Sequence, residues 1–472
     1  MKPREVALYA TLLVPLGLLH AFVLAEICIG LVDILFLAEM ARERNILWAR
    51  KGWFVVALVW WGWLMVCSLP LPEIGLVTAG WVMGFLQAFV IVRLLIFAVA
   101  LQSWVLTTSS GRRWVWVAVA LSCLWIGLES WQQFLTGSNI FGNHRWADGS
   151  LTGPFWKPRA GALYGHLLFA ALLPPLLGLY GKRGASRIAG IVLAILGVVT
   201  SVLIGQRTGT MFTILSLFVV ALFVPQLRRV AAGAVVVGGL VLLATPIISP
   251  PTHAKLVGET SRNLGHFATS PYGELYTRAA TMGLASPWHG WGYNGFRAFC
   301  PEDRFSSGFP VLGVAPTTLV RGACNLHPHN FYLQAFADAG WPGLLLFCAL
   351  NLAWLRVLVR GLWRNPEPMR LGLFIGVFTF SWPLASTDAF PAIYMSGWLF
   401  LMLGLGLAVA QIRDCSKSRS GGRLGAIFCA PVLTYLSTLR SGAQKSHPSD
   451  SPERLLKQSL KPDTIVLDAN HA

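Results

Sequence analysis

An arginine turn is the first feature of this sequence that could do chemistry. Arg207 lies in Gly205-Gln206-Arg207-Thr208-Gly209, a short turn between two runs of Val, Ile, Leu and Phe. One interpretation is an arginine that only reaches the headgroup level from the end of a membrane span. No carboxylate lies near Arg207 in the sequence, however, and a planar guanidinium matches phosphate oxygens in a bidentate manner. Arg207 is therefore a candidate ligand for a lipid phosphate.

A histidine pair is the second such feature. His327-Pro328-His329-Asn330 opens a segment that is expected to form a helix. Pro328 suits the first turn of that helix and would place His329 beside its amino end. The helix dipole disfavours an imidazolium there, and a neutral imidazole is what a general base requires. A metal site is not favoured, because histidines two residues apart do not share a helix face. His327 is expected to be structural or exposed to solvent.

Further basic residues and two cysteines stand in segments that are expected outside the membrane. The basic residues nearest to other motifs are Lys157, Arg159, Arg278 and Arg321. Lys and Arg in short loops are normally retained on the cytoplasmic side, so basic residues in the outer segments need a separate reason for their position. Cys300 and Cys324 are the only two cysteines of the outer segments. In an oxidising compartment they could pair, closing a loop of about two dozen residues.

The composition indicates that these residues belong to a membrane protein. Of 472 residues 55% are hydrophobic and 12% are charged, which excludes a soluble globular fold. The net charge of +17 on so apolar a chain indicates loops at a membrane surface rather than a nucleic-acid groove. A helix needs about 20 apolar residues to cross a bilayer. Twelve such runs are expected to do so, near 6–23, 25–40, 53–70, 80–106, 114–134, 160–181, 188–204, 210–226, 230–249, 341–359, 371–386 and 391–411.

The basic residues also orient these spans. With the N-terminus inside, every inner connection is basic, as the cytoplasmic side requires. The outer turns at 71–79 and 387–390 contain no Lys or Arg. An even number of spans places both termini in the cytoplasm. Arg93 lies inside a span, where an unpaired charge is expensive, and it is expected to pair with Asp33.

These expectations divide the chain into four parts. Residues 1–249 would hold spans one to nine, with an outer loop at 135–159. Residues 250–340 would form a large outer loop and the helix that carries the histidine motif. Residues 341–411 would hold spans ten to twelve. Residues 412–472 are expected to form a basic, mostly disordered cytoplasmic tail.

The order of these motifs resembles that of bacterial O-antigen ligases, in the wider superfamily of O-antigen polymerases and pilin oligosaccharyltransferases. His329-Asn330, nine residues and Gly340-Trp341-Pro342-Gly343 resemble the His-Asn/Ser/Gln and Gly-x-x-Gly signature of the family. The Arg207 turn resembles its small-Arg-small outer turn, although Gln-Arg-Thr stands where a Ser-Arg pair is more usual. Arg278, followed by the segment from Ser286 to Gly292 and by Phe296, resembles the arginine and the P-x-x-G-x-G-x-x-x-F segment of the family's large periplasmic loop.

The resemblance implies an all-α integral membrane protein of the bacterial inner membrane. It would have about 12 transmembrane helices, a GT-C-like fold and a large periplasmic loop between spans nine and ten. The implied reaction transfers O-antigen polysaccharide from undecaprenyl diphosphate to lipid A-core oligosaccharide, among membrane lipids on the periplasmic face. It would invert the anomeric centre and need no metal or other cofactor.

The resemblance also implies roles for particular residues. His329 would be the general base, while Arg207 and Arg278 would clamp the diphosphate. Asp388, in the last outer turn, would orient an imidazole or a sugar. Further substrate contacts are expected from Lys157, Arg159, Arg321 and Asn330.

Three alternatives to a ligase stay open. An O-antigen polymerase would use the same donor with a lipid-linked repeat as acceptor, and a protein O-oligosaccharyltransferase is a further relative. A lipid or solute transporter would show paired halves with broken helices at the midplane. The sequence contains neither an internal repeat nor matched Gly or Pro interruptions.

Overall fold

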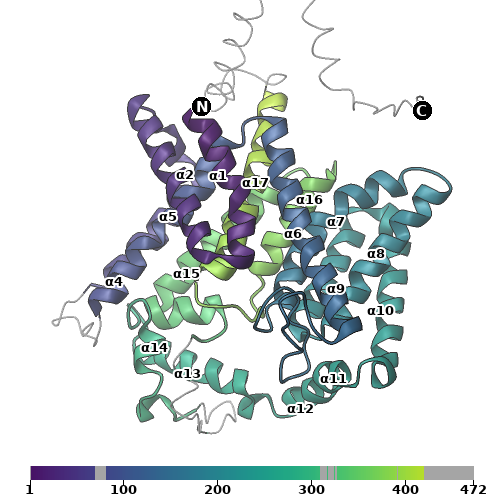
Figure 1. Ribbon diagram of the computed structural model, residues 1–472. Coiled ribbons are helices and arrows are strands. Elements are labelled where there is room, and N and C mark those ends of the chain that lie inside the picture. Colours follow the sequence, from purple (N-terminus) through teal and green to yellow (C-terminus); the bar gives the residue numbers. More distant parts are fainter. Residues whose placement is uncertain are drawn as a thin grey trace, which may run out of the picture. The chain divides into compact units, whose positions relative to one another are not determined.

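The computed structural model describes residues 2–69, 81–308, 316, 324, 327–390 and 392–418, and these residues form helices and no strand (Figure 1). The longer helices are α1 (Pro3–His20), α2 (Phe22–Arg42), α3 (Gly52–Cys67), α4 (Trp81–Val90), α5 (Val92–Ala100), α6 (Ser109–Thr136), α7 (Ala160–Tyr180), α8 (Ala185–Ile204), α9 (Arg207–Phe223), α10 (Arg228–Ile248), α15 (Phe331–Val359), α16 (Pro368–Phe380) and α17 (Ile393–Ser418). Between α10 and α15 lie α11 (Pro250–His253), a π-helical turn (Ala254–Glu259), α12 (Thr260–Gly265), α13 (Pro271–Ala285) and α14 (Gly295–Phe299).

Each of the twelve apolar runs predicted from the sequence overlaps a helix, although the run at 371–386 continues beyond the end of α16 at Phe380. Seven helices within the described residues are long and apolar enough to cross a membrane, which agrees with an integral membrane protein. Their bounds are Met83–Val105, Ser109–Thr136, Ala160–Tyr180, Ala185–Ile204, Pro225–Ile248, Phe331–Val359 and Ile393–Gln411. Three shorter apolar helices are α3, α9 and α16. Twelve spans therefore stay a prediction.

Some helix boundaries differ from those expected. The break between the first two helices lies at Ala21, where the backbone leaves the helical region, rather than near residue 24, as the runs 6–23 and 25–40 imply. The two helices then pack so closely that a Cβ at Gly17 would lie 2.6 Å from the backbone nitrogen of Ala25. Helix α17 continues beyond the expected end at 411 to Ser418. The tail is predicted to be mostly disordered from residue 412. Residues 419–472 lie outside the part of the chain that the structure describes.

The core of residues 2–411 is built around α17. Its apolar segment is 89% buried, against 22% for the segment that contains α10. Helix α17 is therefore central, whereas α10 lies at the edge of the bundle (Figure 1). Exposed Leu240, Leu243 and Ile247 suit contact with lipid.

One ion pair inside the bundle differs from the prediction. The Nε of Arg93 donates a hydrogen bond to Oε2 of Glu26 at 2.9 Å, so that Arg93 pairs with Glu26 instead of Asp33. Glu26 and Asp33 are seven residues apart on α2, which is two helical turns and leaves both on one face. The charge of Arg93 is thus neutralised by the acid nearer to the end of α2.

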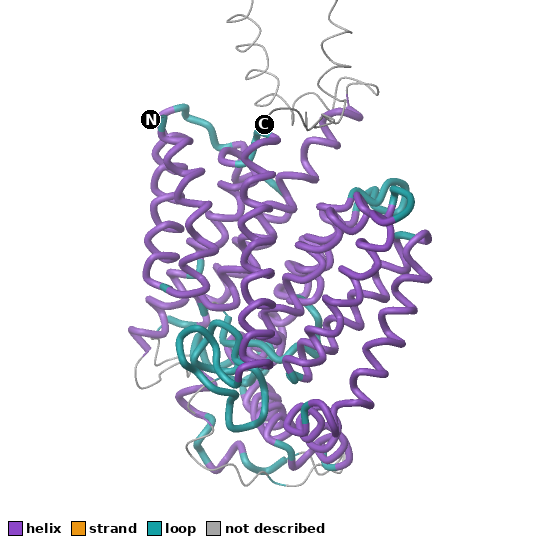
Figure 2. Tube along the Cα trace, turned by 45° about the vertical axis from the view of Figure 1, so that its right-hand side comes forward, coloured by secondary structure: helices purple, strands orange, loops and turns teal. Residues whose placement is uncertain are grey.

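The two long outer segments gather at one end of the bundle. Figure 2 shows the loop after α6 and the short helices after α10 at the end away from the N-terminus. A salt bridge of 2.8 Å between Lys255 and Asp148 joins them. The bundle therefore brings together the two loops that the sequence predicts on the outer side.

Candidate active site

A cavity of about 390 Å³ opens where these loops meet the helix ends. Its size is that of a small-ligand site. The lining residues come from the loop before α7, the starts of α7, α9, α13 and α17, and the turns before α15 and α17. They are Asp148, Ser150, Lys157, Pro158, Arg159, Ala162, Gln206, Arg207, Thr208, Lys255, Tyr272, His327, His329, Ser386, Thr387, Asp388, Tyr394 and Met395. Five of the residues predicted from the sequence therefore share one cavity: Lys157, Arg159, Arg207, His329 and Asp388.

Arg207 is the first residue of α9. Gly205 ends α8 with a φ of 78°, a left-handed conformation that favours glycine, and so turns the chain toward the cavity. The amino end of a helix carries a partial positive charge, which adds to the attraction of the guanidinium for an anion. Glu259 Oε2 lies 3.9 Å from Arg207 Nη2, so the long loop supplies the carboxylate that neighbouring sequence does not.

Arg159 and Lys157 approach the same cavity from the other side. Arg159 precedes the first residue of α7, and its guanidinium carbon lies 4.4 Å from the ring centre of Tyr394. The Tyr394 hydroxyl donates to the Arg159 carbonyl at 2.9 Å. Lys157 Nζ lies 4.4 Å from the ring centre of Trp156. These aromatic contacts restrict the conformations of the two side chains without neutralising their charge. The positive charges can therefore interact with an anionic ligand.

Lys255 is a cavity residue that the sequence motifs did not single out. Its Nζ lies 2.8 Å from Asp148 Oδ2 and 2.9 Å from Glu259 Oε2. The spacing of Lys255 and Glu259, four residues apart, is a signal that the sequence does contain. Asp148 is more than a hundred residues away, and no local pattern points to it. With Arg207, these groups form a network of two cations and two carboxylates along one wall.

His329 also lines the cavity. It adopts a φ of 53°, and its Nδ1 lies 3.1 Å from the carbonyl oxygen of Thr387. A carbonyl only accepts, so Nδ1 carries the proton and Nε2 keeps its lone pair. Burial lowers the pKa of His329 to about 4, and the neighbouring His327 adds to this effect. The imidazole is therefore neutral at physiological pH and can accept a proton.

His327 is not exposed to solvent, which was one of its two expected positions, and a structural role stays a prediction. Its side chain is only 11% exposed and lines the cavity beside His329, with 4.3 Å between the ring centres. Its Nε2 lies 3.1 Å from the same Thr387 carbonyl oxygen and 3.5 Å from Asp388 Oδ1. Burial lowers the pKa of His327, so this ring is neutral too. Asp388 lies close enough to stabilise an imidazolium that forms here.

The helix after the histidines begins later than Pro328 suggested. It starts at Phe331, and the side chain of Asn330 accepts hydrogen bonds from the backbone nitrogens of Tyr332 and Leu333. Asn330 is thus the cap, which is a common role of this residue type. Its Nδ2 donates to the Pro383 carbonyl at 2.6 Å. Asn330 does not line the cavity, where a substrate contact was expected, and instead holds two segments of the protein together.

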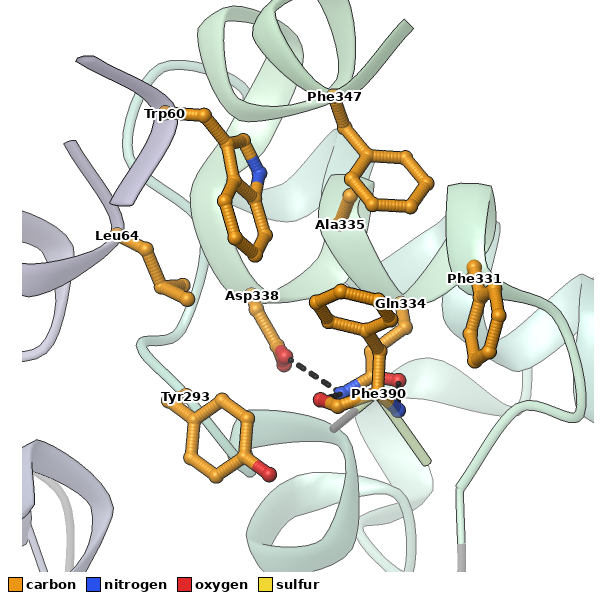
Figure 3. Close-up of a pocket in the computed structure, with 9 residues that line it drawn as sticks. All are labelled: Trp60, Leu64, Tyr293, Phe331, Gln334, Ala335, Asp338, Phe347 and Phe390. Atoms are coloured by element: carbon orange, nitrogen blue, oxygen red, sulfur yellow. Dashed lines mark hydrogen bonds between the residues drawn. The ribbon is translucent and has the colours of Figure 1, made fainter. Parts of the chain in front are cut away.

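The turn that carries Thr387 and Asp388 is fixed to the same helix. Gln334 accepts from the backbone nitrogen of Phe390 at 2.8 Å and donates to its carbonyl at 3.1 Å. Gln334 also donates to Asp338 at 3.3 Å, beneath the rings of Trp60 and Phe347 (Figure 3). The cavity drawn there measures about 10 Å³, enough for one water molecule but not for a substrate. This network positions the turn beside His329, which bonds to the Thr387 carbonyl.

The glycines of the two signature segments dock against each other. At Gly340 (φ 65°) helix α15 breaks, and a Cβ there would lie 2.5 Å from the Pro287 carbonyl oxygen. A Cβ at Gly290 would lie 2.4 Å from the Ala339 nitrogen. Trp341 donates its backbone N–H to that Pro287 carbonyl at 2.7 Å. The break thus provides hydrogen bonds for the long loop, and both glycines are required by this close approach.

Arg278 and the two outer cysteines lie apart from the cavity. The Arg278 side chain is buried on α13, and Nη1 donates to the carbonyl of Cys300. A disulfide joins Cys300 to Cys324. Arg278 thus contacts the disulfide-bonded part of the long loop, and the structure does not bring it to Arg207. The remaining predicted residue, Arg321, lies outside the described residues.

Comparison with known proteins agrees with the motifs. Residues 190–348 match the family described as O-antigen ligase. This segment is about one third of the chain and contains Arg207, Arg278, His329 and Gly340. The match confirms the predicted relationship to the O-antigen ligase and polymerase superfamily, and it does not separate a ligase from a polymerase. No curated protein matches the chain significantly.

Proposed function

We propose that this member of the O-antigen ligase and polymerase superfamily is an O-antigen ligase. It transfers O-antigen polysaccharide from undecaprenyl diphosphate to a hydroxyl of lipid A-core oligosaccharide. The observation that carries the proposal is that a neutral His329 lines the same cavity as a set of cations that includes Arg207. A metal-independent transfer from a diphosphate needs both parts, a base for the acceptor and charge stabilisation for the leaving group.

In the proposed reaction His329 acts on the acceptor, and the cations act on the leaving group. The acceptor hydroxyl attacks the anomeric carbon while its proton passes to Nε2 of His329. The bond from that carbon to the diphosphate oxygen breaks, and its electron pair leaves with undecaprenyl diphosphate. Attack opposite to the leaving group inverts the anomeric centre. Asp388 stabilises the imidazolium through charge, and after transfer the proton passes from Nε2 to water.

The cations hold the diphosphate as its charge develops. Arg207 offers a planar fork and the amino end of α9, and Arg159 offers a second guanidinium from the start of α7. Lys157 and Lys255 add charge in the same cavity. Arg159, Lys157 and Lys255 thereby take the place that the sequence assigned to Arg278, because they line the cavity and Arg278 does not.

The proposed location is the bacterial inner membrane, with a GT-C-like arrangement of twelve spans. Both termini would lie in the cytoplasm, and the cavity would open to the periplasm. Two observations support this orientation. The basic inner connections follow the positive-inside rule, and the cavity lies at the end where the two long outer segments gather.

The proposal is tested with the full-length protein in nanodiscs. Undecaprenyl diphosphate-linked O-polysaccharide is supplied with lipid A-core, with a lipid-linked repeat, or with pilin. A ligase extends lipid A-core only, and the product is seen as a ladder on a gel. Elongation of the lipid-linked repeat would identify a polymerase, and modification of pilin a protein O-oligosaccharyltransferase. Absence of transfer to all three acceptors would refute this class of function.

Removal of the Glu259 charge is expected to strengthen donor binding. Glu259 occupies Lys255 at 2.9 Å and approaches Arg207 at 3.9 Å, so its carboxylate competes with an incoming diphosphate. For a partly exposed pair we expect Glu259→Gln to lower the donor KM about twofold to fivefold at low salt. The gain should shrink at high salt, because screening weakens exposed charges.

The matched control is Glu302→Gln, which removes a carboxylate that pairs with Arg304 and does not line the cavity. Its donor KM should not change. A higher KM in Glu259→Gln would show instead that Glu259 helps binding by orienting Lys255.

A further inference from the structure

We infer that Gln206 is a positioning residue that fixes the spacing between Arg159 and Arg207, and thereby the shape of the diphosphate site. This inference rests on the proposed function. Gln206 immediately precedes α9 and lines the cavity. It also stands at the position where the family pattern more usually has serine, so the longer side chain is a property of this chain.

The Gln206 side chain caps a helix other than its own. It makes no cap hydrogen bond to α9, and its Oε1 accepts from the backbone nitrogen of Ala162 at 2.9 Å. Ala162 is the third residue of α7, where a helix has unpaired N–H groups. The residue at the cap position of α7 is Arg159, whose side chain makes no cap bond. A guanidinium only donates hydrogen bonds, so the Arg159 side chain could not accept from this N–H, and Gln206 supplies the acceptor instead.

The other end of the same amide binds the chain on the far side of Arg159. Gln206 Nε2 donates to the carbonyl of Pro158. A single side chain next to Arg207 therefore binds both residue 158 and residue 162, which bracket Arg159. Among the described residues, no other side chain hydrogen-bonds to both of these backbone groups.

The backbones of α7 and α9 leave no room for another arrangement. A Cβ at Gly209 would lie 2.2 Å from the Gly161 carbonyl oxygen, and a Cβ at Gly161 would lie 2.5 Å from the Gln206 Cβ. The starts of the two helices are thus in direct contact, and Gln206 fixes their register. A diphosphate that bridges Arg159 and Arg207 gains affinity when these groups are already in place.

The test uses the full-length protein in nanodiscs, with undecaprenyl diphosphate as the probe and thermophoresis as the measure of Kd. Gln206→Met keeps the length of the side chain and loses both hydrogen bonds. We expect its Kd to rise about tenfold, while kcat at saturating donor changes less than threefold. Gln132→Met, in a half-buried glutamine of α6 outside the cavity, is the matched control and should leave Kd unchanged.

A double-mutant cycle separates positioning from general destabilisation. If Gln206 acts through the two arginines, Gln206→Met should change Kd less than twofold when Arg159 and Arg207 are already alanine. An equal, additive effect in that background would overturn the inference. So would an unchanged Kd in the single variant.

A second variant covers the case in which Gln206→Met does not fold. Gln206→Glu keeps the acceptor for Ala162 and loses the donor to Pro158. Its Kd should therefore also rise tenfold or more, and an unchanged Kd would refute the inference.

The experiments distinguish failure of this inference from failure of the proposed function. Normal transfer and weaker binding by Arg207→Ala, with normal binding by Gln206→Met, would refute only the inference. Binding that depends on Gln206 in a protein without transfer would refute only the proposed function.

Discussion

Replacement of His329 by asparagine is expected to slow polysaccharide transfer by about 10²–10⁴-fold, the usual contribution of a general base. His329 lines the cavity, and its hydrogen bond to the Thr387 carbonyl leaves Nε2 free to accept the proton of the acceptor hydroxyl. Asparagine tolerates the positive φ of this residue better than alanine does, so the fold should persist. The initial rate at saturating donor and acceptor measures the effect.

Two further measurements distinguish loss of a base from damage to the site. The Kd for undecaprenyl diphosphate should change less than threefold in His329→Asn, and His266→Ala, in an exposed histidine of the long loop, should keep the wild-type rate. Near-normal transfer by His329→Asn would refute the role of base.

The pH profile gives a third test of this base. Burial disfavours the imidazolium and lowers the pKa of His329 to about 4, so the active neutral form persists well below pH 6.5. The acid limb of kcat/KM should therefore lie near pH 4 rather than near 6.5.

The residue types that line the cavity could largely be predicted from the sequence. Which residues come together in the cavity could be predicted only in part. A guanidinium between glycines and a histidine before a helix indicate phosphate and proton chemistry by themselves. The cavity also includes Lys157 and Arg159 because α17, through Tyr394, packs beside the start of α7. That contact joins residues 159 and 394, and no local pattern contains it.

The sequence did not determine which acidic residue pairs with which basic residue. Glu26 and Asp33 share a face of α2, so either one could have met Arg93. Lys255 forms a salt bridge with Asp148 only because two separate loops lie together at one end of the bundle. Asn330 has the chemistry of a substrate contact and is used as a helix cap, since both roles call for the same amide. In each case the residue type was informative and the three-dimensional neighbour decided its use.

Arg207 and Arg278 each resemble an arginine of the family pattern, yet their surroundings predict different outcomes of mutation. Arg207→Ala should lower kcat/KM for the donor by about 10³-fold, because a bidentate phosphate contact and stabilisation of the leaving group are lost together. Arg207→Lys should recover only part of this, since an ammonium lacks the planar fork. Arg278→Ala should lower the melting temperature, because a buried side chain that binds the Cys300 carbonyl is removed.

The Kd for undecaprenyl diphosphate, measured below the melting temperature of each variant, separates the two arginines. It should rise at least tenfold in Arg207→Ala and less than threefold in Arg278→Ala. Arg262→Ala, in an exposed arginine of the long loop that does not line the cavity, controls for loss of net charge and should bind normally. If Arg278→Ala loses affinity as strongly as Arg207→Ala without a change in melting temperature, both arginines contact the diphosphate. The long loop would then have to move toward Arg207 when the donor binds, because Arg278 on α13 lies outside the cavity.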